Sequence, residues 1–162
     1  MGSVETHHTV HQAASTDDDE TAIKAIVYSY YKAVNDSRWD DVVAYFHPDA
    51  TLHIPGQEPK VGTDEIRRFY EAHGRHAVKH HDDVPLLMVD GNRVLTLVDH
   101  HGVGRGGEPI HFWTTGVVTI DNGRFRQYRV IFDTMELPEW MRARKGASRS
   151  ADTSAEVPAP AP

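Results

Sequence analysis

Cysteine is absent from the 162-residue sequence. Disulfide cross-links, thiolate catalysis and zinc sites built on thiolates are therefore excluded. Long hydrophobic runs are also missing, since no apolar stretch approaches the ~18 residues that a membrane span requires. The first residues show no basic region followed by an apolar stretch, so no secretory signal is expected. These absences predict a cytoplasmic protein that does not bind membranes.

Positive charge is scarce, because 17 Lys and Arg residues stand against 24 Asp and Glu residues and the net charge is −7. Nucleic-acid binding depends on basic surfaces that neutralise phosphates, so no nucleic-acid partner is expected. Hydrophobic residues make up 39% and charged residues 25%, which is the balance of an ordinary globular protein. A chain of this length fits one domain with its own core.

The two ends of the chain differ in composition from its middle. Residues 1–15 show no hydrophobic periodicity, and residues 141–162 are rich in Ala, Ser and Pro. Such segments cannot bury enough apolar surface to fold, so both are expected to be disordered. The folded domain is expected to span residues 16–137.

Three amphipathic helices are predicted in the first half of this domain. Asp17 can cap the first helix, and apolar residues then recur at helical spacing as far as Val34. Pro48 disfavours a helical residue before it and ends the second helix. The helices are expected over residues 16–34, 39–46 and 63–74.

The second half of the domain is predicted to form strands. Asp90-Gly91-Asn92 and Asp121-Asn122-Gly123 are tight hairpin signals between them. The glycine-rich stretch 102–107 precedes no helix, so it is interpreted as a loop and not as a phosphate site. Helices followed by an antiparallel meander indicate an α+β fold. Strands are expected over residues 50–54, 80–89, 93–101, 108–120 and 124–133.

The run from Tyr30 to Ala72, YYKAVNDSRWDDVVAYFHPDATLHIPGQEPKVGTDEIRRFYEA, resembles the SnoaL-like family of the nuclear transport factor 2-like superfamily. The segment GRFRQYRVIFD resembles that family's closing strand. The resemblance implies a cone-shaped, curved antiparallel sheet packed against three N-terminal helices around a deep pocket, usually in a homodimer. Members include polyketide cyclases, steroid isomerases, limonene epoxide hydrolase-like and scytalone dehydratase-like enzymes, and non-catalytic binding proteins.

The epoxide hydrolase-like pattern implies which strand faces line the pocket. Leu97, Phe112, Val130 and Phe132 would form its apolar wall. Its polar residues would be His53, Asp99, His101 and Tyr128, with Thr51, Thr114 and Trp39 as further substrate contacts.

Asp99 is the main candidate for acid–base catalysis. It follows the apolar run 94–98, where a solvated carboxylate is not expected, and the matching position in the epoxide hydrolase-like enzymes is an acidic catalytic residue. His53 or His101 would assist it, and Tyr128 would donate to a developing oxyanion. The alternatives are an exposed or Arg-paired Asp99 at a strand end, and a His53 that is bonded to backbone in the core.

Two positions depart from the family patterns. Many family members carry an acid at the position of Val130, and the hydrolase pattern has Arg at the position of Leu97. Ordinary epoxide hydrolysis is therefore not expected.

A second pattern, that of the dehydratase-like branch, is also present. Tyr31 and Asp36 near the end of the first helix, with His80-His81 opening a strand, resemble the Tyr, Asp and His that remove water from a ring. Adjacent histidines point to opposite faces of a strand, so only one of the two can enter the pocket, and His81 is taken as the substrate contact. Asp36 has an alternative role as the cap of the second helix.

No metal and no cofactor is expected. Histidine pairs such as His100-His101 are split across the two faces of a strand, and no HExxH motif is present. The alternative is a site whose ligands converge from different strands. His111 and Trp113 fall on the face opposite Phe112, the convex face that commonly forms the dimer contact in this fold, so a homodimer is expected.

The predicted function is a cofactor-independent acid–base enzyme, a cyclase or isomerase, acting on a small polyketide- or terpenoid-like molecule. A dehydratase, a non-catalytic small-molecule binder and a protein-interaction module remain as alternatives.

Overall fold

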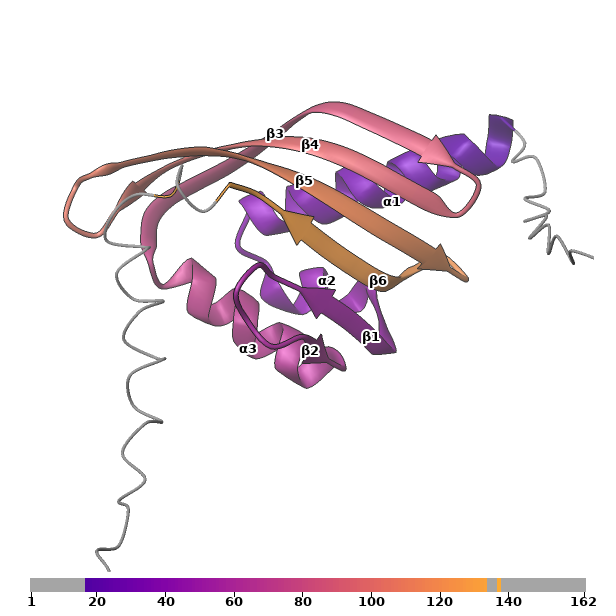
Figure 1. Cartoon of the computed structure of the whole chain (residues 1–162), viewed down its shortest axis with the longest axis horizontal. Helices are drawn as coiled ribbons and strands as arrows, with labels where there is room; N and C mark the ends of the chain where they lie inside the picture. The colour runs from indigo at the N-terminus through magenta and orange to yellow at the C-terminus, as the bar shows by residue number, and fades with distance from the viewer. Residues whose placement is uncertain (1–16, 134–136, 138–162) are drawn as a thin grey trace, which may run out of the picture.

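The computed structural model describes residues 17–133 and residue 137, and it confirms the predicted α+β class (Figure 1). The expected disordered ends, residues 1–15 and 141–162, lie outside the described residues. The elements in chain order are α1 (Asp17–Asn35), α2 (Trp39–Ala44), β1 (Phe46–His53), β2 (Lys60–Val61), α3 (Thr63–Gly74), β3 (Ala77–Asp90), β4 (Arg93–Gly104), β5 (Pro109–Asp121) and β6 (Arg124–Ile131).

The strands form one curved, unclosed sheet in the order β2-β1-β6-β5-β4-β3. The strands from β3 to β6 are an antiparallel meander, as predicted. β1 runs parallel to β6, so the sheet is not antiparallel throughout, and β2 is a short edge strand that the sequence did not indicate. The helices lie against the concave face (Figure 1).

The two predicted hairpins connect the long strands. At the turn between β5 and β6, Asn122 and Gly123 both have positive φ, at 48° and 73°. A two-residue turn with positive φ at both positions matches the right-handed twist of the strands that it joins. This turn fixes the register in which β6 lies beside β5.

α1 presents one apolar side to the sheet. Val27, Tyr30, Tyr31 and Val34 are buried there at helical spacing. Acidic residues fill the first turn, where the helix dipole favours negative charge.

α2 is shorter than predicted. It ends at Ala44, and Phe46 opens β1 instead of closing the helix. Pro48 lies within the strand, where the pairing of β1 with β6 shifts register between Phe46 and Thr51. This irregularity accommodates a residue that has no backbone N–H to donate to the ladder.

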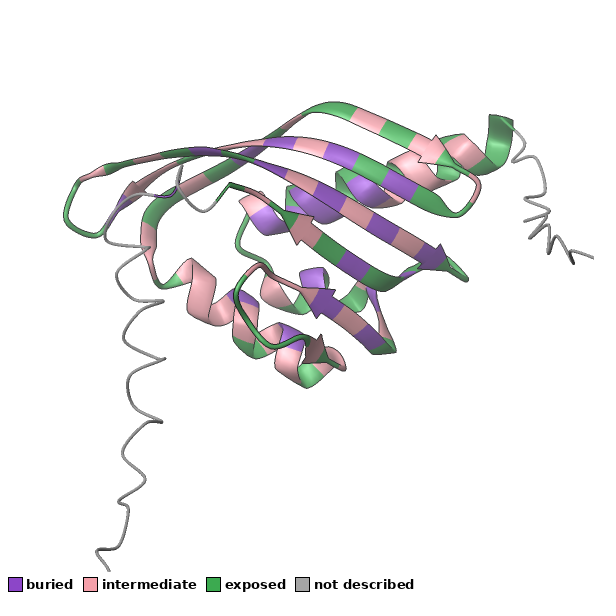
Figure 2. Ribbon diagram, viewed as in Figure 1, coloured by how far each residue is buried: buried purple, intermediate pink, exposed green. Residues whose placement is uncertain are grey.

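The core lies between the helices and the concave face of the sheet, and buried and exposed residues alternate along the strands (Figure 2). Tyr30 packs edge-to-face against Phe125, with ring centroids 5.0 Å apart, and Phe46 packs against both rings. Such aromatic pairs add to the stability that their burial provides. None of the described helices has the length and hydrophobicity needed to cross a bilayer.

Candidate active site

A cavity of about 440 Å³ opens between the concave face of the sheet and the helices. This volume suits a small organic molecule. Its apolar lining includes Phe69, Phe112, Phe132 and Leu137, the last of which is buried although it lies beyond β6. The polar residues in its lining are Tyr30, Tyr31, Gln57, Tyr70, His73, His76, His80, Asp82, His100, Thr114 and Tyr128.

Asp82 is the charged centre of this lining. It lies on β3, and its side chain is only 4% exposed. The Asn35 side chain at the end of α1 fixes the Asp82 backbone, since its Oδ1 accepts from the Asp82 N–H at 2.7 Å and its Nδ2 donates to the Asp82 carbonyl at 3.0 Å. The end of α1 thereby holds the carboxylate in position.

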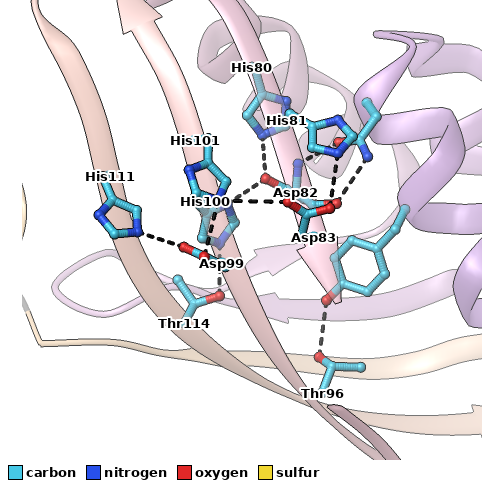
Figure 3. Close-up of polar contacts among 12 residues, drawn as sticks. His80, His81, Asp82, Asp83, Thr96, Asp99, His100, His101, His111 and Thr114 are labelled. Carbon is cyan, nitrogen blue, oxygen red and sulfur yellow. Dashed lines mark hydrogen bonds and ion pairs between the residues drawn. The ribbon is translucent and has the colours of Figure 1, made fainter. Parts of the chain in front are cut away.

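His100 lies opposite Asp82 on the neighbouring strand β4 (Figure 3). Its Nδ1 is 2.6 Å from Oδ1 of Asp82, and its Nε2 is 2.8 Å from the Thr114 hydroxyl on β5. The Phe112 ring stacks on the imidazole, with centroids 4.7 Å apart. Both ring nitrogens are therefore engaged, and the plane of the ring is fixed.

His80 approaches the same carboxylate from β3 itself. Its Nε2 lies 2.7 Å from Oδ1 of Asp82, but the contact lacks the alignment of a hydrogen bond. Within the described part of the chain, neither ring nitrogen of His80 has a hydrogen-bond partner. Buried polar atoms are normally satisfied, so His80 has bonding capacity left for a molecule in the cavity.

Two opposing effects set the pKa of Asp82. Burial alone raises this pKa, but the hydrogen bond with His100 and the close approach of His80 outweigh burial and hold it well below its usual range. Asp82 is therefore ionised at neutral pH. For His73, which lines the cavity beside His80, burial lowers the pKa to about 4, so this imidazole is neutral.

Two tyrosine hydroxyls of the lining meet the hydroxyl of a fully buried threonine. The Tyr31 hydroxyl is 3.0 Å from Oγ1 of Thr96 and 2.9 Å from the Tyr128 hydroxyl. Burial raises the pKa of Tyr31 to about 12 and raises that of Tyr128 well above its ordinary value. Both phenols are thus protonated donors at neutral pH.

Six residues expected at the pocket do line the cavity. Tyr31 comes from α1, and the other five come from β5, β6 and the residue that follows β6. They are Tyr31, Phe112, Thr114, Tyr128, Val130 and Phe132.

Asp99, the main candidate from the sequence, does not line the cavity, and its expected placement was wrong. The residues of β4 that face the helices are Val94, Thr96, Val98 and His100. Side chains alternate along a strand, so Asp99 lies on the opposite, outer face together with Leu97 and His101. The outer face is also apolar at Leu95 and Leu97, and this similarity of the two faces hid the correct phase.

The structure also corrects the expected positions of four other residues. Ala50 and Leu52 are fully buried and form the inner face of β1. Thr51 and His53 alternate with them and therefore lie on the outer face. Trp39 stacks on Tyr70 in the core and is not part of the lining. His80 and not His81 reaches the cavity, since the His81 side chain is 58% exposed.

Asp36 takes no part in the site either. Its carboxylate is exposed and pairs with Lys32 at 3.0 Å and with Arg38 at 3.3 Å. These contacts place it at the surface between α1 and α2. Its side chain makes no capping hydrogen bond to the backbone at the start of α2, so the expected capping role is also not observed.

Asp82 and His100 were not predicted from the sequence, and His80 was left unresolved beside His81. Their signal was present as the doublets His80-His81, Asp82-Asp83 and His100-His101. In each doublet one member must face inward. What the sequence lacked was the cross-strand register, which sets Asp82 opposite His100.

A curved open sheet, with helices over its concave face and a cavity between them, defines a nuclear transport factor 2-like α+β protein. The chain belongs to the SnoaL-like domain family, whose model matches residues 27–128.

Solved structures share this fold at low sequence identity. A nuclear transport factor 2-like protein of unknown function from Burkholderia pseudomallei is 22% identical over 71% of this chain and 93% of its own, with a TM-score of 0.66. An epoxide hydrolase of the limonene epoxide hydrolase-like type from Mycobacterium tuberculosis is 20% identical over 82% and 98%, with a TM-score of 0.65. SalBIII, an epoxide hydrolase/cyclase-like enzyme of pyran ring formation in the polyether salinomycin, is 20% identical over 73% and 95%, with a TM-score of 0.66.

Proposed function

We propose that the protein is an enzyme that performs general acid–base chemistry, without a cofactor, on a small molecule in the cavity. The hydrogen-bonded series Asp82–His100–Thr114 carries this proposal. Ionised Asp82 accepts the Nδ1 proton of His100, so Nε2 accepts from the Thr114 hydroxyl, which would pass its proton to Nε2 as it takes one from the substrate. A fixed imidazole of this kind can take a proton from a substrate and return it elsewhere.

The tyrosine hydroxyls supply the complementary function. Removal of a proton beside a carbonyl places negative charge on the carbonyl oxygen, and this charge needs hydrogen-bond donors. Tyr31 and Tyr128 are protonated, are already oriented by each other and by Thr96, and line the same cavity as His100. A base and an oxyanion site in one cavity support cyclisation or isomerisation of a carbonyl compound.

The apolar lining favours a polyketide- or terpenoid-like ring as substrate. Phe69, Phe112, Phe132 and Leu137 would contact its carbon skeleton. The fold similarity to a cyclase-like enzyme of polyether formation is consistent with this class. Val130 lines the cavity without the acid that many relatives carry there, so epoxide hydrolysis is not proposed.

Dehydration is a second candidate, supported by His80. Tyr31 and His80 both line the cavity, and the His80 nitrogens lack hydrogen-bond partners among the described residues. Tyr31 would donate to a leaving hydroxyl while His80 or His100 removes the proton. Loss of one water in the product mass distinguishes this reaction from isomerisation.

The test uses ring ketones and hydroxyketones of polyketide and terpenoid type in D₂O. NMR follows deuterium exchange beside the carbonyl, and mass spectrometry follows products. Asp82→Asn and His100→Gln are expected to lower exchange or turnover by roughly 10²- to 10⁴-fold, because the oriented base is lost. The matched controls Asp121→Asn and His47→Gln alter exposed or partly exposed residues away from the cavity and should retain wild-type rates.

Two outcomes would contradict the proposal. Wild-type rates in folded Asp82→Asn and His100→Gln would remove the catalytic series from the mechanism. Saturable binding of the panel without exchange or product would instead identify a non-catalytic binder.

We also propose a homodimer that forms through the outer face of the sheet. Leu86, Met88, Leu95 and Trp113 are exposed on this face by 39% to 58%. Register pairs bring Met88 beside Leu95 and Leu86 beside Leu97, so the apolar side chains are contiguous. Apolar sheet patches of this kind commonly mark subunit contacts.

A further inference from the structure

The outer face of the sheet carries a second group of histidines and aspartates, here called the outer cluster. It consists of His81, Asp83, Asp99, His101 and His111 from the neighbouring strands β3, β4 and β5. His81, His101 and His111 lie in one cross-strand row, and Asp83 and Asp99 lie in the next such row (Figure 3). Cross-strand partners point to the same face, so all five side chains meet outside the cavity.

Asp99 connects the two closest histidines of this cluster. Its Oδ1 is 2.8 Å from Nε2 of His111, and its Oδ2 is 3.0 Å from Nε2 of His101. The two imidazole rings are nearly parallel, at 12°, with centroids 5.0 Å apart. One carboxylate and two imidazoles thus direct their ligand atoms to a common place, all within 4.8 Å of one another.

We propose that Asp99, His101 and His111 bind one divalent transition-metal ion of the zinc type. Imidazole nitrogen and carboxylate oxygen are the ligands that zinc takes in the absence of cysteine. A fourth position would be filled by water or by Asp83, whose Oδ2 is 3.7 Å from Nε2 of His101. This site is separate from the proposed acid–base chemistry and does not depend on it.

The side chains need only a small movement to admit the ion. Ligand atoms around a tetrahedral zinc ion are about 3.3 Å apart, given metal–ligand distances of about 2.0–2.1 Å. The present separations of 2.8 and 3.0 Å are slightly shorter, and the side chains of His101 and His111 are 46% and 58% exposed. They are therefore free to open around a cation.

The charge of the outer cluster also favours a cation. It contains two carboxylates, and within residues 17–133 neither Asp83 nor Asp99 forms an ion pair with Lys or Arg. A divalent ion would neutralise both. The sheet already holds metal ligands on adjacent strands close together, so binding costs less conformational entropy.

The inner group of His80, Asp82 and His100 is a poorer ion site, although its ligand atoms are also close together. Both imidazoles there approach the same oxygen of Asp82, at 2.6 and 2.7 Å, and the carboxylate is buried. An ion would have to separate groups that Asn35 and Thr114 hold in place. The side chains of the outer cluster are held by fewer such contacts.

The test is calorimetric titration of the chelator-treated full chain with ZnCl₂, together with the visible spectrum of the Co²⁺-loaded protein. The wild type is expected to bind one Zn²⁺ at this site and to give the absorption of tetrahedral Co²⁺. His111→Ala and Asp99→Asn should weaken that binding at least tenfold, because each removes one ligand, and His101→Ala/His111→Ala should abolish both signals. Circular dichroism checks that these surface variants remain folded.

Control variants assign the signal to the outer cluster. His47→Ala changes a histidine elsewhere on the sheet, and His7→Ala/His8→Ala/His11→Ala removes the histidines of the N-terminal segment. His100→Gln changes the inner group. All three should keep the tight Zn²⁺ event and the Co²⁺ spectrum. Absence of Zn²⁺ binding by the wild type, or binding that survives in His101→Ala/His111→Ala, would overturn the proposal.

Discussion

Asp82 joins two layers of the molecule. Its backbone is bonded to the end of α1 through Asn35, and one oxygen of its side chain contacts imidazoles from β3 and β4. Burying a carboxylate is costly unless it is paired, and both histidines lower that cost. The same contacts that make the buried charge tolerable also orient His100 towards the cavity.

His73 gives folding stability a pH dependence. Burial lowers its pKa to about 4, whereas in the unfolded chain it takes up a proton near pH 6.5. Between these values the unfolded state binds more protons, so the free energy of unfolding falls as the pH is lowered from about 6.5 to 4. We expect the wild type to lose about 2 kcal/mol of its free energy of unfolding over this window, and His73→Phe not to show this loss. The figure is smaller than the full pKa shift implies, because the His73 ring borders the cavity.

Urea unfolding at a series of pH values from 7.5 to 4.5 measures this effect. Val42→Ala is a suitable control, because it removes fully buried methyl groups without a titrating group and should lower stability equally at every pH. If His73→Phe and the wild type lose stability in parallel on acidification, His73 is not the source of the dependence.

At the scale of single residues, the sequence predicted the kinds of group in the site better than their positions. Tyr31, Tyr128 and Thr114 were expected at the cavity and do line it. Asp99 was expected to be the carboxylate of the cavity, but that position is occupied by Asp82. The alternation along β4 allowed two phases, since apolar residues occur on both faces. Only the packing of β4 against α1 and its pairing with β3 decides between them.

β5 passes close to the hydroxyl network at Gly116. A Cβ atom built at this position would lie 2.6 Å from Oγ1 of Thr96 and 2.9 Å from Cε2 of Tyr128. We expect Gly116→Ala to lower the free energy of unfolding by about 1–3 kcal/mol, because these packed groups must move. Urea unfolding measures the loss, and tyrosine near-ultraviolet circular dichroism reports the displacement of Tyr128.

Thr115→Ala is the matched control on the same strand. Its side chain points to the outer face, so the cost should remain below about 1 kcal/mol. Equal costs for the two variants would show that the space at Gly116 is not limiting.

At the scale of elements, local signals were sufficient where the chain turns sharply. The break between the first two helices and both hairpins appear as predicted. The end of α2 was misplaced because Phe46 continues the apolar stripe of a helix while tertiary pairing draws it into β1. Neither the parallel pairing of β1 with β6 nor the two-residue β2 has a local signature, since both arise from long-range contacts.

For the whole molecule, the exposed apolar patch predicts association in solution. We expect the wild type to sediment as a dimer at micromolar concentration and Met88→Glu to shift it towards monomer, because a charge would be buried at the contact. Tyr28→Glu is the control, since Tyr28 is an exposed aromatic residue of α1, away from this face. A monomeric wild type, or an unchanged Met88→Glu dimer, would contradict the proposed interface.

Because of the doublets His80-His81, Asp82-Asp83 and His100-His101, the two faces of the sheet carry nearly the same types of side chain. A shift of one residue in a strand sends every side chain beyond it to the other side. Loss or gain of a single codon within β3 or β4 would therefore exchange buried and solvent-facing members of these doublets while changing the chain by only one residue. Length variation, and not only point substitution, is thus a direct route by which this scaffold can acquire new reactivity.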